Sequence, residues 1–218
     1  MINQKSIAYL CATLFIFPIF CQASTTNQSR HPLYVGALGG FGSTTWFGLV
    51  PSKANQNIAI TMSTPINSQE GGQIWGALGG YEFNPFFAIE GNYTSYPRAT
   101  VIYDPFSIFS FNNDGATRLY TDTEALSIMG KVMLVIPKTE IRVYSSAGIA
   151  NVHRKDIILD QWRSSPTFGV GVNFPITEHF MGEVGGNYTA GYGESQLDPT
   201  DTYFPFLYSV SLRLAYRF

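Results

Sequence analysis

The last twelve residues of the chain alternate regularly between apolar and polar side chains. The apolar set is Tyr208, Val210, Leu212, Leu214, Tyr216 and Phe218, and the polar set is Ser209, Ser211, Arg213, Ala215 and Arg217. A period of two places successive side chains on opposite faces of a β-strand. If the apolar face met lipid, a shift by one residue would turn two arginines into it, at about 2–4 kcal/mol each near the midplane. The pattern therefore predicts a strand with a well-specified register.

Seven further segments have similar lengths and, with varying regularity, the same alternation. They are 33–42, 74–83, 86–96, 123–136, 139–151, 165–174 and 180–191. Each approximates the 9–11 residues that a tilted strand needs to cross a bilayer. The 123–136 segment is the least regular, because Met129, Met133 and Val135 share its polar face. Apolar stretches at 57–64 and 99–113 are the places where further strands could form.

Short and long connections between these segments alternate along the chain. The short ones are Asn84-Pro85, Pro137-Lys138 and 175–179, and the long ones are 43–73, 97–122, 152–164 and 192–204. Prolines in the short connections end strands. Transmembrane barrels have short periplasmic turns and longer extracellular loops, whereas a secreted sandwich or a lipocalin-like barrel has no reason for this alternation. The sequence predicts an all-β fold, an eight-stranded antiparallel transmembrane up-and-down β-barrel.

The first 23 residues have the features of a secretory signal peptide. Lys5 supplies a positive charge, an apolar stretch covers 7–20, and Cys21-Gln22-Ala23 is an acceptable cleavage site. We expect a signal peptide at 1–23 and an outer-membrane β-barrel at 24–218, with an uncleaved N-terminal anchor as the alternative. Downstream of the cleavage site, no apolar run approaches the roughly 20 residues of a spanning helix.

Composition supports a membrane barrel and argues against nucleic acid as a partner. Charged residues are only 13% of the chain while aromatic residues are 15%, and the mean hydropathy is +0.04. Soluble domains carry about 25% charged residues. The net charge is −2, so no basic surface predicts binding to nucleic acid.

Eight charged side chains fall on the polar faces of the predicted strands. They are Glu82, Glu90, Lys131, Glu140, Arg142, Glu183, Arg213 and Arg217, four acids and four bases. The interior of an eight-stranded barrel is just wide enough for side chains to fill it, and desolvated charges need partners. We expect an internal salt-bridge network with Glu90, Lys131, Arg142 and Glu183 near mid-depth. Such a network is either a structural plug or part of a narrow ion path.

The chain resembles the small OmpA-like outer-membrane barrels, including opacity-type surface proteins. The resemblance lies in the glycine-rich first strand Tyr34-Val35-Gly36-Ala37-Leu38-Gly39-Gly40, the four long loops and the closing Tyr216-Arg217-Phe218. It implies a location in the outer membrane of a Gram-negative bacterium, in contact with outer-membrane lipid and lipopolysaccharide. It also implies that Tyr216 and Phe218 form the signal read by the outer-membrane assembly machinery. We expect a monomer.

Catalytic residues, cofactors and metal sites are not expected. The three histidines, His31, His153 and His179, are dispersed, and both cysteines lie in the predicted signal peptide, so metal ligands are few. Ser145 and Ser146 precede His153, but nothing resembles the compact His-x-Ser arrangement of the deacylase barrels.

The two longest loops carry the candidate binding surface. Loops 43–73 and 97–122 contain the aromatic residues Trp46, Phe47, Tyr103, Phe106, Phe109 and Phe111. Aromatic side chains anchor interfaces, so these loops are candidates for binding an external partner such as a host surface. Alternatively, the rings pack on each other or rest against lipopolysaccharide. The leading hypothesis is a non-enzymatic structural surface protein with adhesive loops; the alternatives are a small-solute channel and a lipid A-modifying enzyme.

Overall fold

The computed structural model describes residues 31–52, 62–193 and 202–218. The predicted signal peptide, 1–23, lies outside the described residues. Eight long strands form the main body: β1 (Leu33–Thr44), β3 (Gly72–Asn84), β4 (Phe87–Ser95), β6 (Arg118–Val135), β7 (Arg142–Lys155), β8 (Asp160–Pro175), β9 (Phe180–Thr189) and β10 (Leu207–Arg217). In the described part of the chain, no helix is long and apolar enough to span a membrane.

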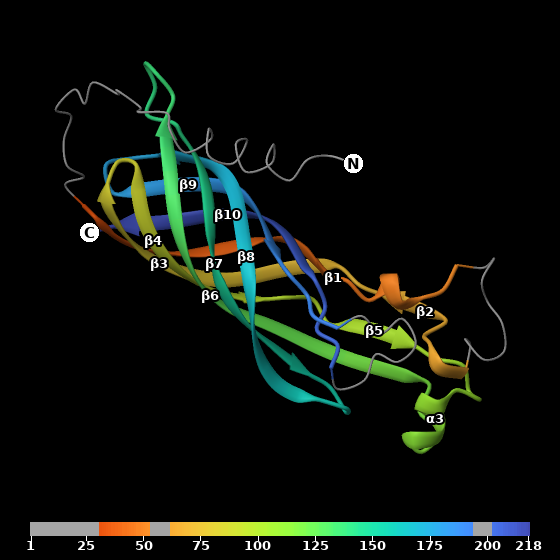
Figure 1. The fold of residues 1–218 in the computed structure, drawn as a ribbon. Coiled ribbons are helices and arrows are strands. Elements are labelled where there is room, and N and C mark those ends of the chain that lie inside the picture. Colours follow the sequence, from red (N-terminus) through yellow and green to blue (C-terminus); the bar gives the residue numbers. More distant parts are fainter. Residues whose placement is uncertain (1–30, 53–61, 194–201) are drawn as a thin grey trace, which may run out of the picture.

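The eight strands close into an antiparallel barrel. Their order is β6-β4-β3-β1-β10-β9-β8-β7, and pairing of β6 with β7 closes the ring. The first and last strands pair from Tyr34↔Arg217 to Thr44↔Leu207, so they lie side by side in the ring. Figure 1 shows an elongated barrel with the C-terminus at one end and a small helix, α3, at the other. The predicted eight-stranded antiparallel barrel is confirmed.

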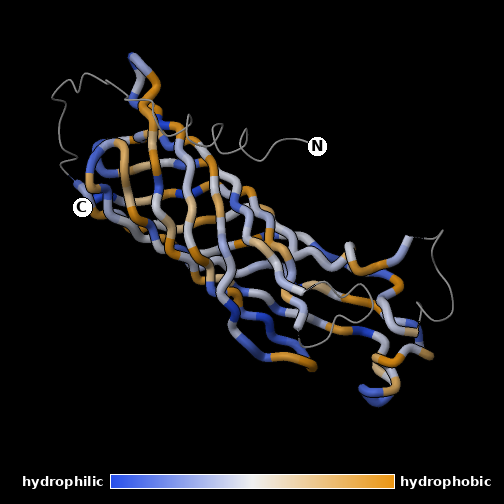
Figure 2. Tube along the Cα trace, viewed as in Figure 1, coloured by the Kyte–Doolittle hydropathy of each residue, from blue (hydrophilic) through white to orange (hydrophobic). Residues whose placement is uncertain are grey.

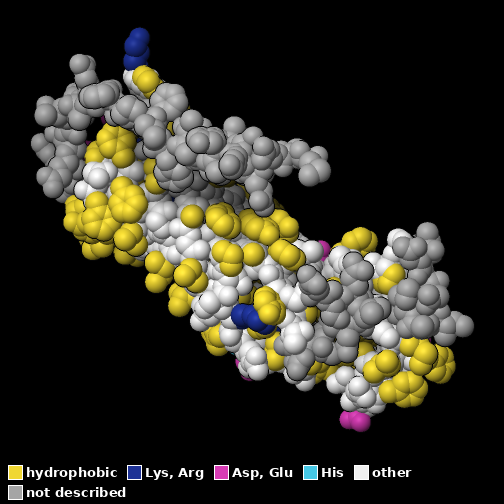
Figure 3. All heavy atoms as spheres, viewed as in Figure 1, with side chains coloured by type: hydrophobic (Ala, Val, Ile, Leu, Met, Phe, Trp, Pro, Cys, Tyr) yellow, Lys and Arg dark blue, Asp and Glu magenta, His cyan; other side chains and the backbone are white. Residues whose placement is uncertain are grey.

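The two faces of the wall follow the alternation read from the sequence. In β10, Val210 and Leu212 are more than half exposed on the outside, whereas Arg213 points inward and is 2% exposed. Figure 2 shows hydrophobic and hydrophilic residues interspersed along each strand rather than gathered in runs. On the side of the molecule seen in Figure 3, hydrophobic side chains dominate the outer surface of the strands. An apolar outside and a polar inside are what a barrel wall needs in lipid.

We call the two ends of the barrel the short-turn end and the loop end. At the short-turn end the described connections are residues 85–86, 136–141 and 176–179. At the loop end, β6, β7 and β8 are longer than their neighbours, with 18, 14 and 16 residues. These strands carry the sheet beyond the length that a bilayer requires.

One predicted loop is a continuation of two strands. Residues 152–164 were expected to be a long loop, but β7 and β8 pair through this region as far as Lys155↔Asp160. Only 156–159 connect them, and the Asp156 carboxylate accepts hydrogen bonds from the backbone N–H groups of Ile158 and Leu159, each at 2.9 Å. An aspartate that satisfies backbone donors in this way closes a tight turn, so the polar composition of the segment marks a hairpin.

The sequence allowed further strands at 57–64 and 99–113. The one that forms in the described residues lies outside the barrel wall. Within 99–113, β5 (Ala99–Ile102) pairs with β6 and with the short β2 (Asn67–Gln69), and α3 spans Ile108–Asn112. Of 57–64, only residues 62–64 are described, and they form no strand. A 3₁₀ helix, η1 (Phe47–Leu49), follows β1. All of these elements lie at the loop end (Figure 1).

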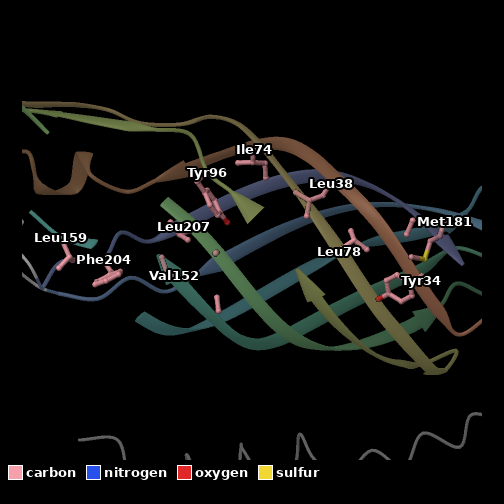
Figure 4. Close-up of a cluster of buried hydrophobic side chains, with 13 residues drawn as sticks. Tyr34, Leu38, Ile74, Leu78, Tyr96, Val152, Leu159, Met181, Phe204 and Leu207 are labelled. Carbon is pink, nitrogen blue, oxygen red and sulfur yellow. The ribbon is translucent and has the colours of Figure 1, made fainter. Parts of the chain in front are cut away.

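Apolar side chains fill much of the barrel interior. The larger buried cluster includes Leu38, Ile74, Leu78, Tyr96 and Leu207. Figure 4 shows its members spread along the inside of the barrel, from Tyr34 and Met181 toward one end to Phe204 and Leu159 toward the other. The barrel is therefore a packed core as well as a membrane wall.

Candidate functional site

A closed ring of charges occupies the middle of the lumen. The Lys131 Nζ lies 2.7 Å from the Glu90 Oε2 and 2.7 Å from the Glu183 Oε2. From another strand, the Arg213 Nη1 lies 2.9 Å from the Oε1 atoms of both glutamates. Two cations therefore bridge the same two carboxylates. All four residues are almost wholly buried, and burial of charges on this scale requires such mutual compensation.

Two tyrosines complete the hydrogen bonding of this ring. The Tyr34 hydroxyl donates to the Glu90 Oε2 at 2.8 Å, and the Tyr144 hydroxyl donates to the Glu183 Oε1 at 2.6 Å. The Lys131 ammonium also lies 4.3 Å from the centre of the Tyr144 ring, close enough for a cation–π contact. Both tyrosines lie at inward positions of strands, but the sequence offered no sign that they contact charges.

A second charge cluster lies nearer the short-turn end. Arg142 binds Glu82 through two hydrogen bonds of 3.0 and 2.9 Å, and the Arg217 Nη2 reaches the same carboxylate at 2.8 Å. Arg142 also donates to the Asn173 Oδ1 at 3.2 Å. One carboxylate thus lies between two guanidinium groups. The expectation that Arg142 lies near mid-depth is wrong, because β7 begins at this residue, and Arg213 is the second cation of the mid-lumen ring. Bidentate Arg–carboxylate pairs are among the stronger charge-assisted contacts.

Glu140 is not part of either cluster, and its prediction as a lumen residue is wrong. The strand expected from residue 139 begins at Arg142, so Glu140 lies exposed in the turn 136–141. The turn is fixed by Lys138, which has a positive φ of 65°, and by Thr139, whose hydroxyl donates to the Ile136 carbonyl at 2.9 Å. Without Glu140, the predicted set places three acids and four bases in the lumen instead of four of each.

A small polar cavity lies in the lumen on the loop side of the charge ring. Its volume is about 20 Å³, and its lining includes Asn92, Tyr96, Ser127, Thr167 and Asn187. A single water molecule needs roughly 10–15 Å³, so this cavity cannot hold a larger solute. Together with the charge ring and the buried apolar cluster, it supports the structural plug over the ion path.

A conductance measurement tests the plug. We expect the folded wild-type protein in planar lipid bilayers to show no steady openings, because the mid-lumen side chains fill its cross-section and neutralise one another. The same conductance measurement is made on the variants Lys131→Met and Arg142→Met. Steady wild-type openings whose conductance or ion selectivity changes in these variants would reject the plug.

A second buried cluster lies at the loop end, outside the membrane-spanning wall. We call it the loop-end core, and its buried members are Trp46, Leu49, Ala99, Val101, Tyr103, Leu119 and Tyr203. The Trp46 and Tyr203 rings meet edge to face with their centroids 4.9 Å apart. Phe109 stacks on Tyr103 at 4.1 Å. The first, second and fourth loops are thus packed on a common core.

Arg154 lies at the centre of the contacts that hold the loops together. It is fully buried, and its Nε lies 2.7 Å from an Asp156 carboxylate oxygen. Its Nη1 donates to the Tyr203 carbonyl at 2.6 Å, and its guanidinium lies 5.0 Å from the centre of the Trp46 ring. The Tyr203 hydroxyl in turn donates to the Thr45 carbonyl, and burial raises its pKa. The third hairpin is therefore joined to the first and fourth loops.

The six loop aromatics divide into two groups. Trp46 and Tyr103 are buried in the loop-end core and Phe109 packs against it, as expected from the alternative in which the loop rings pack on each other. Phe47, Phe106 and Phe111 are exposed, by 63%, 74% and 70% of their surfaces. Some of the loop rings therefore pack on each other, whereas the rest face the outside.

The histidines lie apart from one another except at the short-turn end. There, the rings of His31 and His179 are 4.7 Å apart. His153 is at the loop end, where its Nε2 lies 2.7 Å from the Asp160 Oδ1 and its ring stacks on Trp162 at 4.4 Å. Over 31–52, 62–193 and 202–218, no three His, Asp, Glu or Cys side chains gather as a metal-binding group.

The residues expected to form the assembly signal lie together on the outside of the barrel. Tyr216 contacts Phe218 with ring centroids 5.0 Å apart, and it also contacts Phe180 and His179. The backbone N–H of Phe218 donates to the Leu33 carbonyl at 2.9 Å, which seals the junction between the last and first strands. These rings form an aromatic group at the short-turn end, where barrels carry an interfacial girdle. Recognition of this group by the assembly machinery is our proposal.

Solved structures of small outer-membrane barrels share this fold. The chain is 13% identical to Neisserial surface protein A, with a TM-score of 0.53 over 85% of this chain and 97% of that one. It is 12% identical to OprG from Pseudomonas aeruginosa, with a TM-score of 0.52 over 88% of this chain and 99% of that one. Identities this low show the fold alone.

Sequence comparison shows the family directly. An uncharacterized protein of Coxiella burnetii is 23% identical to this chain, and the alignment covers 89% of this chain and 88% of the relative. The model of the outer membrane protein β-barrel domain matches residues 12–218. The chain lies in the outer membrane of a Gram-negative bacterium, as its resemblance to the OmpA-like barrels implied. It belongs to the outer membrane protein β-barrel domain family.

Proposed function

We propose that this protein is a non-enzymatic surface protein whose loop end binds an external partner through an apolar tip. We define the apolar tip as the exposed side chains of Phe106, Ile108 and Phe111, on and next to α3. The observation that carries the proposal is that these side chains are exposed on an ordered support. Exposed apolar groups on a rigid surface favour binding, because little conformational freedom is lost when a partner covers them.

The support under the apolar tip is built from the neighbouring residues of α3. Ser107 caps the helix by accepting a hydrogen bond from the Ser110 backbone N–H at 3.1 Å, and the Ser110 hydroxyl donates to the Asp104 carbonyl at 2.9 Å. Phe109 is held by its stacking on Tyr103. Ile108 and Phe111, three residues apart, share the opposite, exposed face of the helix.

The position of the tip also supports the proposal. In Figure 1, α3 lies at the far end of the molecule from the C-terminus, beyond the ends of most barrel strands. The loop end of such a barrel faces the outside of the cell. A partner on another surface, such as a host cell, would meet this end first. The packed lumen argues against the small-solute channel as the main function.

Substitution of two tip residues tests the proposal. We expect bacteria that express Phe106→Ser/Phe111→Ser to adhere to host cells at least tenfold less than bacteria that express the wild type. Covering one Phe side chain contributes about 1.5–3 kcal/mol, and about 1.4 kcal/mol is a factor of ten in binding. Asn112→Ser, an exposed polar change on the same helix, is the matched control. Unchanged adherence of the double variant at equal surface expression would reject the binding role.

A chemical assay separates the surface protein from the lipid A-modifying alternative. On overexpression of the wild type, we expect the mass spectrum of extracted lipid A to match that of cells without the gene. A new lipid A species that appears with the wild type would contradict the non-enzymatic assignment.

A further inference from the structure

A groove on the outer face of the barrel crosses β1, β10, β9 and β8. Its volume is about 570 Å³, and its lining is almost entirely apolar. Strand pairing shows how it forms, because Val210, Gly186 and Val170 are directly opposite one another on β10, β9 and β8. All three positions point outward. The groove is therefore a gap, one side chain wide, that Gly186 leaves between two valines.

A side chain at position 186 would find open space. A Cβ atom placed there would contact only the Ser209 carbonyl oxygen, at 3.6 Å, which is an ordinary van der Waals distance. By contrast, a Cβ at the inward-facing Gly185 would overlap the Tyr144 hydroxyl. The backbone at Gly186 does not require a glycine for local packing. What the glycine does is keep the groove open.

The rim of the groove has the character of a membrane interface. On the loop side, Tyr188 and Tyr208 pair across β9 and β10, with their ring centroids 5.2 Å apart. Phe41, 70% exposed, lies beside Val210 on the neighbouring strand. Tyrosines collect where hydrocarbon meets headgroups, so the groove begins at that boundary and runs into the hydrocarbon layer. It lies in the loop-end half of β1, β9 and β10, which corresponds to the outer leaflet.

We propose that this groove is a binding site for one acyl chain of lipid A. The outer leaflet of this membrane is built of lipopolysaccharide, and the lining carries no charged side chain. Apolar groups in lipid associate through close packing rather than by leaving water. A slot between two β-branched side chains packs around a single methylene chain, and the tyrosine hydroxyls at its rim lie level with the sugar headgroup.

The test compares retention of lipid A by variants that keep the barrel intact. Protein folded in detergent is incubated with purified lipid A, passed through detergent exchange and measured by native mass spectrometry. We expect the wild type to retain one lipid A molecule and Gly186→Leu to retain at least fivefold less, because the new side chain fills the slot. Gly186→Ala should give an intermediate loss, and it replaces the larger variant if that one fails to fold.

The control is Gly91→Leu on β4, on the opposite side of the barrel. Gly91 also faces outward, and a Cβ there would meet only two carbonyl oxygens at 3.8 Å. This variant should retain lipid A as the wild type does. Equal retention by wild type and Gly186→Leu, equal retention of phosphatidylethanolamine by the wild type, or a dimer that Gly186→Leu abolishes would each overturn the proposal.

Discussion

Replacing Lys131 by methionine is expected to destabilise the folded barrel by about 3–5 kcal/mol, the range for breaking a buried ion pair. Lys131 is 2% exposed and bridges Glu90 and Glu183 at 2.7 Å each. Its removal leaves two buried carboxylates with Arg213 as their shared cation. The measurement is the free energy of unfolding in urea, with the protein folded into lipid vesicles and followed by tryptophan fluorescence.

A second substitution should recover most of that loss if charge balance is the cause. In Lys131→Met/Glu183→Gln, one cation and one anion remain in the ring, and the glutamine oxygen can still accept the hydrogen bond from Tyr144. Glu140→Gln in the exposed turn is the control, with an expected change within about 0.5 kcal/mol. Two results would show that the stability of the ring does not depend on its charge balance. One is that Lys131→Met is as stable as the wild type, and the other is that the double variant is as unstable as Lys131→Met.

The wall of the barrel was predictable because each strand obeys one local rule. Any side chain in a barrel strand meets either lipid or the lumen, so a period of two separates Arg213 from Leu212 without knowledge of any partner. The same rule found Glu90, Lys131 and Glu183 as interior charges. It could not find the hydroxyl contacts of Tyr34 and Tyr144, since a tyrosine at an inward position is equally suited to apolar packing.

Strand ends were less predictable because they depend on turns. Glu140 continues the alternation of β7 in the sequence, but Lys138 and Thr139 fix a turn that delays the strand until Arg142. At the other end of the same strand, polar residues suggested a loop. There, regular pairing with β8 continues to Lys155. Composition alone does not distinguish a polar loop from a hairpin that extends into water.

The loop-end core could not be derived from local patterns. Arg154 and Tyr203 are 49 residues apart in the chain, and their contact exists only because the barrel brings the loops to one end. The same long-range packing buries Trp46 and leaves Phe47 exposed, although they are neighbours in sequence. The sequence therefore identified the loops that carry the candidate binding surface but not which of their aromatic residues face outward.

Replacing Arg154 by methionine is expected to loosen the loop end while leaving the barrel intact. The substitution keeps an apolar stem but leaves the Asp156 carboxylate buried without its guanidinium and the Tyr203 carbonyl without that donor. Loss of one partner from a buried pair costs about 3–5 kcal/mol. Since the spanning part of the wall does not depend on this contact, the cost should appear as local opening of the loops.

Limited chymotrypsin digestion and hydrogen exchange measure this effect. In Arg154→Met, we expect cleavage near Trp46 and Tyr203 at least tenfold faster than in the wild type, with unchanged heat-dependent mobility of the barrel on gels. Arg98→Met is the matched control, because Arg98 also forms a bidentate pair with an aspartate, Asp122, but on an exposed surface. Exposed pairs contribute at most about 1 kcal/mol. If the two variants were cleaved at the same rate, burial of Arg154 would not be what holds the loops on their common core.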